Sequence, residues 1–239
     1  MSRMKSRGLI FSIAFLSFSM SGLNAQRSNF CTNNFFYPQV DKKLTYTNYD
    51  NKDKIKSIQE QTVKSIKNTD TGFEATVTTS SKDEKGKETM SAKEFLVKCE
   101  NGELKLDLSN MMMNEMAGKM KDMEIKMSGD SLSYPSTFEI GKSLPDANML
   151  MEVGMNGTTM FTGKFLIKNR KIEAKESITT TAGTFDCYKI SYDMDINMMV
   201  KRTLKVNQWL SPGIGLIKSV NLDSKGEVSN RRELTAMEK

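Results

Sequence analysis

The segment that most constrains the fold runs from Tyr188 to Val200, where every second residue is apolar and the residues between them are polar up to Asn197. Side chains of a β-strand point to opposite faces in turn, so this pattern predicts one long strand with a buried face and a solvated face. The apolar positions are Tyr188, Ile190, Tyr192, Met194, Ile196, Met198 and Val200.

The stretch EFLVKCENGELKLDLS, residues 94–109, predicts a tight hairpin. The pair Asn101-Gly102 suits a two-residue type I′ turn, in which both residues have positive φ. Such a turn places three apolar pairs opposite one another, so turn chemistry and burial favour the same register. The pairs are Cys99–Leu104, Val97–Leu106 and Phe95–Leu108.

Two further hairpins are predicted with glycine-containing loops of three residues, at 85–87 and at 156–158. The first loop sets Phe73, Ala75 and Val77 opposite Cys99, Val97 and Phe95, and the second sets Val153 opposite Phe161 and Met149 opposite Phe165. The fold class is therefore predicted to be all-β. We expect an antiparallel meander that forms a barrel-like or half-open barrel sheet in one domain, residues 26–239.

The stretch MMMNEMAGKMKDMEIKM, residues 111–127, contains seven methionines. Spacings of three and four favour a short helix near 110–121, and the alternation from Met123 to Ser128 favours a strand. Three interpretations stay open: a Cu(I) site of soft thioether ligands, ordinary core or a lid, and an apolar ligand surface. A chain without histidine cannot complete a mixed copper site, which disfavours the first.

Residues 1–25 have the features of a secretory signal peptide. Arg3, Lys5 and Arg7 precede an apolar stretch shorter than a membrane span, and cleavage is expected between Ala25 and Gln26. Removing these three cations from 35 Lys and Arg leaves 32, against 29 Asp and Glu. The charges are interspersed, so we expect no nucleic-acid partner. Because the apolar stretch is too short for a spanning helix, we also expect no membrane span.

Three cysteines in an exported chain can form one disulfide and leave one thiol. Cys31 lies near the mature N-terminus, and Cys99 lies at an accessible hairpin end. Cys187 precedes the long alternating strand, a setting typical of a buried thiol. We predict Cys31–Cys99, with the other two pairings and the absence of any disulfide left open.

Catalytic motifs are scarce. The absence of histidine excludes Ser-His-Asp and Cys-His catalysis and an ordinary zinc site. Asp193 and Asp195 share one face of a strand, but alternation places that face in solvent. We therefore expect no enzyme, no cofactor and no metal.

Four segments together resemble a known family: CTNNFFYPQVDKKLTYTNYDNKDK, GKSLPDANMLMEV, KIEAKESITTTAGTFDCYKISY and QWLSPGIGLIKSVNLDSKGEV. In this order they resemble the TapB-like family of exported, uncharacterised β-rich proteins of Bacteroidota. The resemblance implies a Gram-negative protein of the periplasm or cell surface with an antiparallel, barrel-like sheet. It implies no catalytic residues.

The expected function is that of an exported binding protein whose flexible apolar interior holds a hydrophobic ligand or a partner segment. The alternative is a structural component of a cell-envelope or adhesion assembly, with a filled core and envelope proteins as partners. The candidate lining of the binding interior consists of unbranched and aromatic side chains at predicted inward positions. These are Met113, Met116, Met120, Met151, Phe161, Met194 and Met198.

Overall fold

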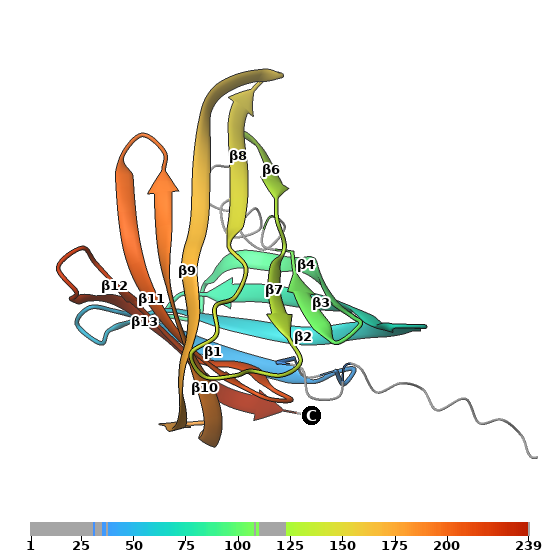
Figure 1. Ribbon diagram of the computed structural model, residues 1–239. Helices are drawn as coiled ribbons and strands as arrows, with labels where there is room; N and C mark the ends of the chain where they lie inside the picture. Colours follow the sequence, from blue (N-terminus) through green and yellow to red (C-terminus); the bar gives the residue numbers. More distant parts are fainter. Residues whose placement is uncertain (1–30, 32–34, 37, 108, 110–122, 239) are drawn as a thin grey trace, which may run out of the picture.

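The computed structural model describes residues 31, 35–36, 38–107, 109 and 123–238. These residues form thirteen strands that belong to one sheet (Figure 1). The strands are β1 (Lys43–Asp50), β2 (Ile55–Thr69), β3 (Gly72–Lys82), β4 (Glu88–Glu100), β5 (Glu103–Leu106), β6 (Glu124–Gly129), β7 (Leu132–Pro135), β8 (Ala147–Met155), β9 (Thr158–Thr180), β10 (Gly183–Asn197), β11 (Lys201–Ser211), β12 (Gly215–Leu222) and β13 (Val228–Glu238).

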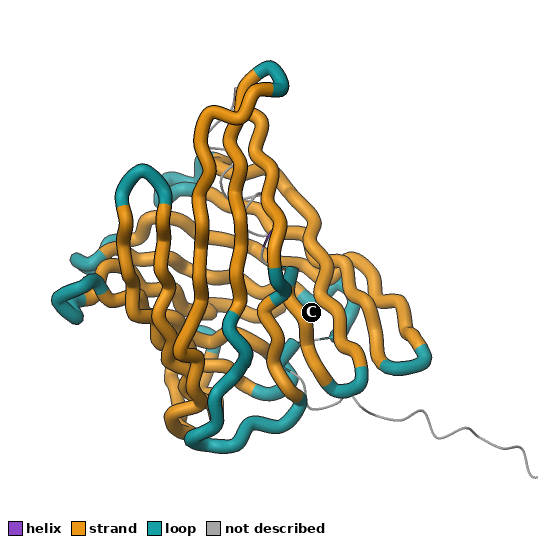
Figure 2. The backbone as a smooth tube through the Cα atoms, turned by 45° about the horizontal axis from the view of Figure 1, so that its top comes forward, coloured by secondary structure: helices purple, strands orange, loops and turns teal. Residues whose placement is uncertain are grey.

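The sheet curls so that its two edges are consecutive in the chain. Its order is β6-β8-β9-β10-β11-β12-β13-β1-β2-β3-β4-β5-β7, and all neighbours are antiparallel. Within the described chain no ladder joins β6 to β7. Only Asp130 and Ser131 link these two edge strands. The prediction of an all-β, half-open barrel is confirmed (Figure 2).

Gly129 allows the chain to pass from one sheet edge to the other. Its φ of +143° is one that L-residues with a side chain rarely adopt. A Cβ at this position would lie 2.2 Å from the carbonyl oxygen of Asn148 on β8. The next residue, Asp130, stays bound to β8, because its N–H donates to the Asn148 carbonyl and its carboxylate accepts the Asn148 N–H. The chain then turns away to pair with β5.

The alternating segment up to Asn197 forms the C-terminal part of β10, which begins before Tyr188 and ends three residues before the predicted end at Val200. Ile190 and Tyr192 are buried, and Met194 and Ile196 are half-buried on the same side. The strand ends at Asn197, and residues 198–200 form the connection to β11. Val200 is consequently exposed rather than inward-facing.

The predicted hairpin registers are confirmed wherever the structure describes them. Asn101 and Gly102 have φ of 50° and 83°, as a type I′ turn requires. Cys99 pairs with Leu104 and Val97 with Leu106, whereas Leu108 lies outside the described residues. The predicted pairs of β3 with β4 and of β8 with β9 are also present.

The two three-residue loops differ from the prediction because bulges absorb a residue. A bulge between Val153 and Gly154 leaves Asn156-Gly157 as a two-residue turn, with φ of 51° and 76°. Two register shifts near Ser81 move the first loop back by one residue, to 84–86. The register that buries the apolar pairs is kept in both cases, which shows that burial determines the pairing and the loop adapts.

The same hydrogen-bonding pattern, from backbone N–H groups to an aspartate carboxylate, recurs in the loops of three hairpins. Asp50, Asp83 and Asp223 each begin a five-residue stretch, DNKDK, DEKGK or DSKGE. Each aspartate carboxylate accepts the backbone N–H groups of the residues two and four positions later, at 2.8 to 3.0 Å. The fourth residue has positive φ: it is Asp53 in the first loop and glycine in the other two. These bonds satisfy amides that the ladder leaves free.

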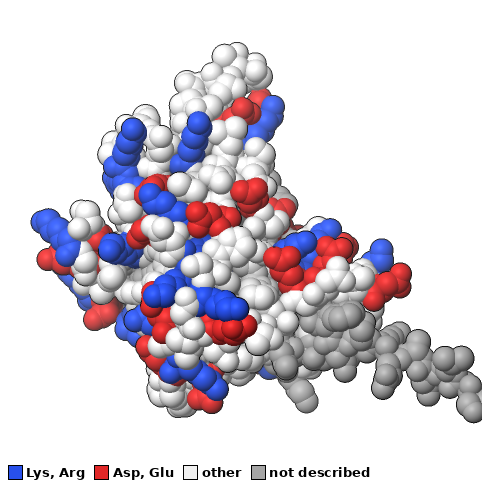
Figure 3. All heavy atoms as spheres, in the orientation of Figure 1, with Lys and Arg blue, Asp and Glu red and all other residues white. Residues whose placement is uncertain are grey.

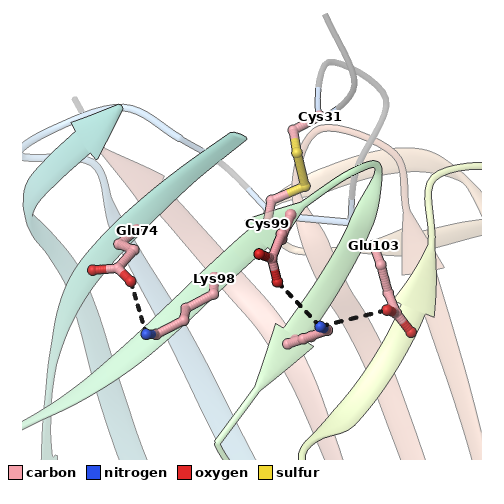
Figure 4. A network of polar contacts seen from close by, with 7 residues as sticks. Cys31, Glu74, Lys98, Cys99 and Glu103 are labelled. Carbon is pink, nitrogen blue, oxygen red and sulfur yellow. Dashed lines mark hydrogen bonds and ion pairs between the residues drawn. A yellow bond between two sulfur atoms is a disulfide. The ribbon is translucent and has the colours of Figure 1, made fainter. Parts of the chain in front are cut away.

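The predicted disulfide between Cys31 and Cys99 is confirmed (Figure 4). Its Cα atoms are 6.1 Å apart, and the bond fastens the N-terminal segment to β4. Surface ion pairs flank it, including Glu74–Lys98 at 2.7 Å. The predicted strand from Met123 is present as β6, and the predicted helix near 110–121 lies outside the described residues.

Candidate apolar binding site

An apolar cavity of about 170 Å³ lies inside the sheet. Nine strands contribute to its wall, together with Phe35, Phe36 and Lys42 from the N-terminal segment and Ile214 from the turn before β12. The described residues that line it are Phe35, Phe36, Lys42, Leu44, Tyr46, Gln61, Val63, Val77, Phe95, Val97, Leu104, Leu106, Leu132, Tyr134, Gln208, Leu210, Ile214, Gly215, Leu216 and Arg232.

The N-terminal segment supplies an aromatic part of this wall. Phe35 is buried and stacks on Phe138, with ring centroids 3.9 Å apart. Phe36 stacks on Phe73 at 5.8 Å, close to the disulfide end of β3. The Cys31–Cys99 bond therefore ties down a segment that forms part of the cavity wall.

Few polar groups reach the cavity. The Tyr134 hydroxyl donates to Gln208 Oε1 across the interior at 3.4 Å. The guanidinium of Arg232 lies over the Tyr46 ring, 4.4 Å from its centroid, a distance typical of a cation–π contact. Burial raises the pKa of Tyr46 to about 12, so its hydroxyl stays protonated at neutral pH.

Arg170 lies beside the cavity wall and is 1% exposed. A bulge in β9 turns it inward, because Asn169 has a φ of 56° and both residues face Tyr192 of β10. Its guanidinium donates to the carbonyls of Pro145 at 2.7 Å and Ser133 at 3.0 Å. It also lies 4.9 Å from the ring centroid of Tyr134. This buried cation therefore fixes β7 and a cavity-lining tyrosine.

A broader depression of about 810 Å³ is formed by β6, β8, β9, β10, β11 and Asp130. Asp195 lies in it, but Lys168 and the Thr203 hydroxyl bind its carboxylate and lower its pKa. Asp193 accepts a bond from the Asn169 amide at 2.8 Å. The two carboxylates therefore have structural partners, as expected of a solvated face.

The candidate lining residues meet in a different part of the interior from the cavity. Met151 is fully buried, and Phe161, Met194 and Met198 are half-buried against the same core cluster. Met198 and Met151 converge above Gly163, where an added Cβ would meet them at 3.0 and 3.1 Å. None of the four lines the 170 Å³ cavity. Met113, Met116 and Met120 lie outside the described residues.

Four further features of the described residues bear on function. Cys187 is a buried free thiol, and burial raises its pKa to about 12. Among the described residues, no group of three His, Cys, Asp or Glu side chains could hold a metal ion. No helix in the described ranges is long and apolar enough to cross a membrane. On the face in Figure 3, basic and acidic side chains are intermingled.

The sequence reasoning missed the cavity residues Tyr134, Gln208 and Arg232. Arg232 carried a usable signal, because it precedes the buried Leu234 by two positions in β13 and so shares its face. A charged side chain at an inward position of a strand indicates a special role. Tyr134 and Gln208 gave no comparable signal, since the contact between them depends on the curvature of the whole sheet.

Comparisons with known proteins agree on the fold. A family model described as DUF3108-like matches residues 40–234. A Bacteroides fragilis protein, provisionally described as exported and as having a YmcC-like fold, is 22% identical, with a TM-score of 0.73 over 87% of this chain and 100% of its own.

A Parabacteroides distasonis protein, provisionally described as a lipoprotein, is 21% identical, with a TM-score of 0.73 over 87% of this chain and 99% of its own. No curated protein matches the chain. At these identities the two structures show the fold alone, and neither they nor the family model carries the TapB-like name.

Proposed function

We propose that this chain, which belongs to the DUF3108-like family, is an exported, non-catalytic binding protein that holds a small apolar ligand inside its curved sheet. The observation that carries the proposal is the 170 Å³ cavity with a mostly aliphatic and aromatic wall. Pockets for small molecules have this character, with few polar groups that fix orientation. A cavity of about 150 Å³ with such a wall is known to admit benzene.

The wall also has the adaptability that a carrier of apolar groups needs. Phe35 and Phe36 come from a segment outside the sheet, so they can shift without breaking a ladder. The methionine-rich interior around Met151 and Met198 consists of unbranched side chains that change rotamer at low cost. This supports the proposal that the interior enlarges when a ligand enters.

Location outside the cytoplasm is part of the same proposal. The leader-like residues 1–25 favour export, and the two similar structures are provisionally described as an exported protein and a lipoprotein. We propose cleavage after Ala25, a single domain from residue 26 to residue 239, and a TapB-like protein of the Gram-negative envelope. Edman sequencing of the secreted protein tests the cleavage site, and an N-terminus other than Gln26 would refute it.

The binding proposal is tested with 1-octanol as a neutral apolar probe, by calorimetry on the mature chain. We expect one octanol per chain. The variant Val77→Phe places a ring into the cavity, so it should weaken octanol binding at least tenfold. Because the ring fills empty space, the free energy of unfolding should change by less than about 1 kcal/mol.

Val153→Phe is the matched control. Val153 is fully buried like Val77 but does not line the cavity. Its enlargement should cost about 1–3 kcal/mol of stability, the usual cost of overpacking, and leave octanol affinity unchanged. Equal destabilisation by the two variants, with no octanol bound to the wild type, would show that the interior is filled.

A filled interior would favour the second candidate, a structural part of an envelope or adhesion assembly. The observation in its favour is the set of exposed apolar side chains at two hairpin tips. Met155 and Met160 flank the β8–β9 turn, and Met199 and Val200 lie in the β10–β11 connection, with Met199 85% exposed. Exposed apolar tips of this kind are suited to contact a protein partner.

A further inference from the structure

We propose that the end of the β10–β11 hairpin docks the protein on an anionic lipid surface. Met199 and Val200 enter the boundary between lipid head groups and acyl chains. Lys164, Lys201 and Arg202 bind the phosphates of the head groups. This surface is separate from the apolar cavity, so the inference goes beyond the proposed function. It follows from the exposure of the hairpin apex, the positions of the three cations and the partners of the carboxylates around them.

The apex of this hairpin presents apolar side chains to solvent. Residues 198–200 connect β10 to β11, and the end of the hairpin projects from the sheet (Figure 1). Met199 is 85% exposed and Val200 is 62% exposed, the two highest values among the large apolar side chains that the structure describes. Met198, by contrast, lies inward beside Gly163. The connection is therefore anchored at its base, while two apolar side chains stay outside the core.

Three cations lie directly behind the apex. Lys164 of β9 and Lys201 of β11 both pair with Asn197, the last residue of β10. Paired residues of neighbouring strands point to the same face, and with strands about 4.8 Å apart the two lysine backbones are about 10 Å apart. Arg202 follows Lys201 in the strand and therefore points to the opposite face. The hairpin thus carries basic side chains on both faces, just below its apolar end.

The described residues leave these three cations without a counter-charge. No carboxylate in the described ranges forms an ion pair with any of them. All three line the open depression of about 810 Å³, together with the carboxylates of Asp130 and Asp195. Asp130 accepts the backbone N–H of Asn148, and Asp195 forms its ion pair with Lys168. The potential at this end of the sheet is consequently positive, and it attracts an anionic surface.

For this hairpin a lipid surface is a better partner than a protein. Two apolar side chains expose far less than the roughly 800 Å² that a stable protein interface buries on each partner. A bilayer requires no fitted shape, because apolar groups enter at the head-group boundary while lysine and arginine keep their charged ends among the phosphates. The order found here, an apolar apex with cations behind it, matches the order of these layers.

The test measures sedimentation of the mature chain with vesicles. One preparation is an equimolar mixture of phosphatidylglycerol and phosphatidylcholine, and the other is phosphatidylcholine alone. Each cation near an anionic surface strengthens binding about fivefold, so three cations should give roughly a hundredfold preference for the anionic vesicles at low salt. Salt should weaken this preference, because it screens exposed charges.

Two sets of substitutions separate the charged and the apolar contributions. Lys164→Gln, Lys201→Gln and Arg202→Gln together should remove the preference for anionic vesicles. Met199→Ser with Val200→Ser should weaken binding to the anionic vesicles at least about tenfold, because the inserted apolar surface is lost.

Other loops offer matched controls. Lys52→Gln, Lys54→Gln and Lys225→Gln together remove the same charge from exposed positions in the β1–β2 and β12–β13 loops. Ile140→Ser is the control for Val200→Ser, since Ile140 is 61% exposed. Both controls should keep the preference of the wild type for anionic vesicles.

Equal binding of the wild type to both kinds of vesicle would overturn the inference. So would an equal loss on removal of the loop lysines and of the hairpin cations. If the wild type binds neither vesicle, the lipid surface is refuted and a protein partner remains to explain the exposed apex. None of the substituted residues lines the apolar cavity, so octanol affinity should stay the same in every variant. Failure of vesicle binding therefore leaves the proposed function intact, and failure of octanol binding leaves the lipid inference intact.

Discussion

The guanidinium of Arg170 donates a hydrogen bond to the backbone carbonyl of Ser133 at 3.0 Å, and so joins β9 to the edge strand β7 through the interior. In the described chain β7 has only four residues and pairs only with β5. A second N–H of the same guanidinium donates to the Pro145 carbonyl at 2.7 Å. The position of β7 in the half-open barrel thus depends on the Arg170 side chain as well as on the backbone hydrogen bonds between strands.

Arg170→Met should therefore destabilise the protein. It leaves two buried carbonyls without a donor, and each lost partner costs about 1–3 kcal/mol. We expect a loss of about 3 kcal/mol in the free energy of unfolding, measured by urea titration. Arg170→Lys can satisfy one carbonyl and should lose less. Hydrogen exchange should accelerate in β7 more than in β2; uniform acceleration would contradict a local role.

The strand register was predictable because burial and turn chemistry agree on it. Asn101-Gly102 admits one tight turn, and that turn places Cys99 against Leu104 and Val97 against Leu106. A slip by one residue would turn every one of these side chains to the solvated face. The turn residues and the apolar pattern therefore each predict the same register.

The bulges were not predictable in the same way. Phe165 and Ile167 face the interior, and so do Arg170 and Ile172. The first pair has odd and the second even positions, so in a regular strand they would point to opposite faces. The bulge at Asn169 makes this switch, and asparagine tolerates its positive φ without requiring it. Alternation alone would place Arg170 in solvent. Its burial is explained by its hydrogen bonds to the carbonyls of Ser133 and Pro145, which are distant in sequence.

Removal of the disulfide is the second prediction. Cys31→Ser with Cys99→Ser opens a loop spanning 68 residues, and the loss of this constraint on the unfolded chain costs about 4 kcal/mol. Phe35 and Phe36 should also pack less firmly, so octanol binding should weaken. The checks are urea titration of the oxidised wild type and the variant, followed by calorimetry. Unchanged stability would show that Phe35 packing alone holds the segment.

Gly129→Ala is the third prediction. Its Cβ would lie 2.2 Å from a backbone oxygen of β8, and its φ of +143° is strained for alanine. We expect a loss of about 3 kcal/mol, because β6 must separate from β8. Gly226→Ala is the matched control, since its φ is +81° but nothing lies within 4 Å of the added methyl. It should cost about 1 kcal/mol. Thermal unfolding measures the loss of stability in both variants.

The candidate site illustrates why a lining is harder to predict than a fold. The methionines attracted attention because they are numerous, and Met151 and Met198 do meet in the interior. The cavity, however, is lined by residues of nine strands, and its position depends on how the sheet curves between β7 and β11. Bulges contribute to this curvature, and they cannot be read from residue types along one strand.

The fourth prediction concerns alkaline pH. Burial raises the pKa of the Cys187 thiol from 9.0 to about 12, so the folded protein binds this proton more tightly than the unfolded chain. Its contribution to stability is complete below pH 9 and is lost as the pH rises toward 12. The free energy of unfolding should therefore fall above pH 9 by up to about 1.4 kcal/mol per pH unit from this group.

Cys187→Ala tests this origin of the alkaline loss. The substitution lowers stability at every pH because it leaves a small cavity, so the slope between about pH 9 and about pH 10.5 is the informative quantity. We expect a shallower slope in the variant, measured by urea titration at each pH. Tyr46, whose pKa is raised from 10.0 to about 12, keeps part of the slope above pH 10. Identical slopes in both proteins would mean that the Cys187 thiol ionises in the folded state as readily as in the unfolded chain, which is incompatible with a side chain that is fully buried beside Phe185.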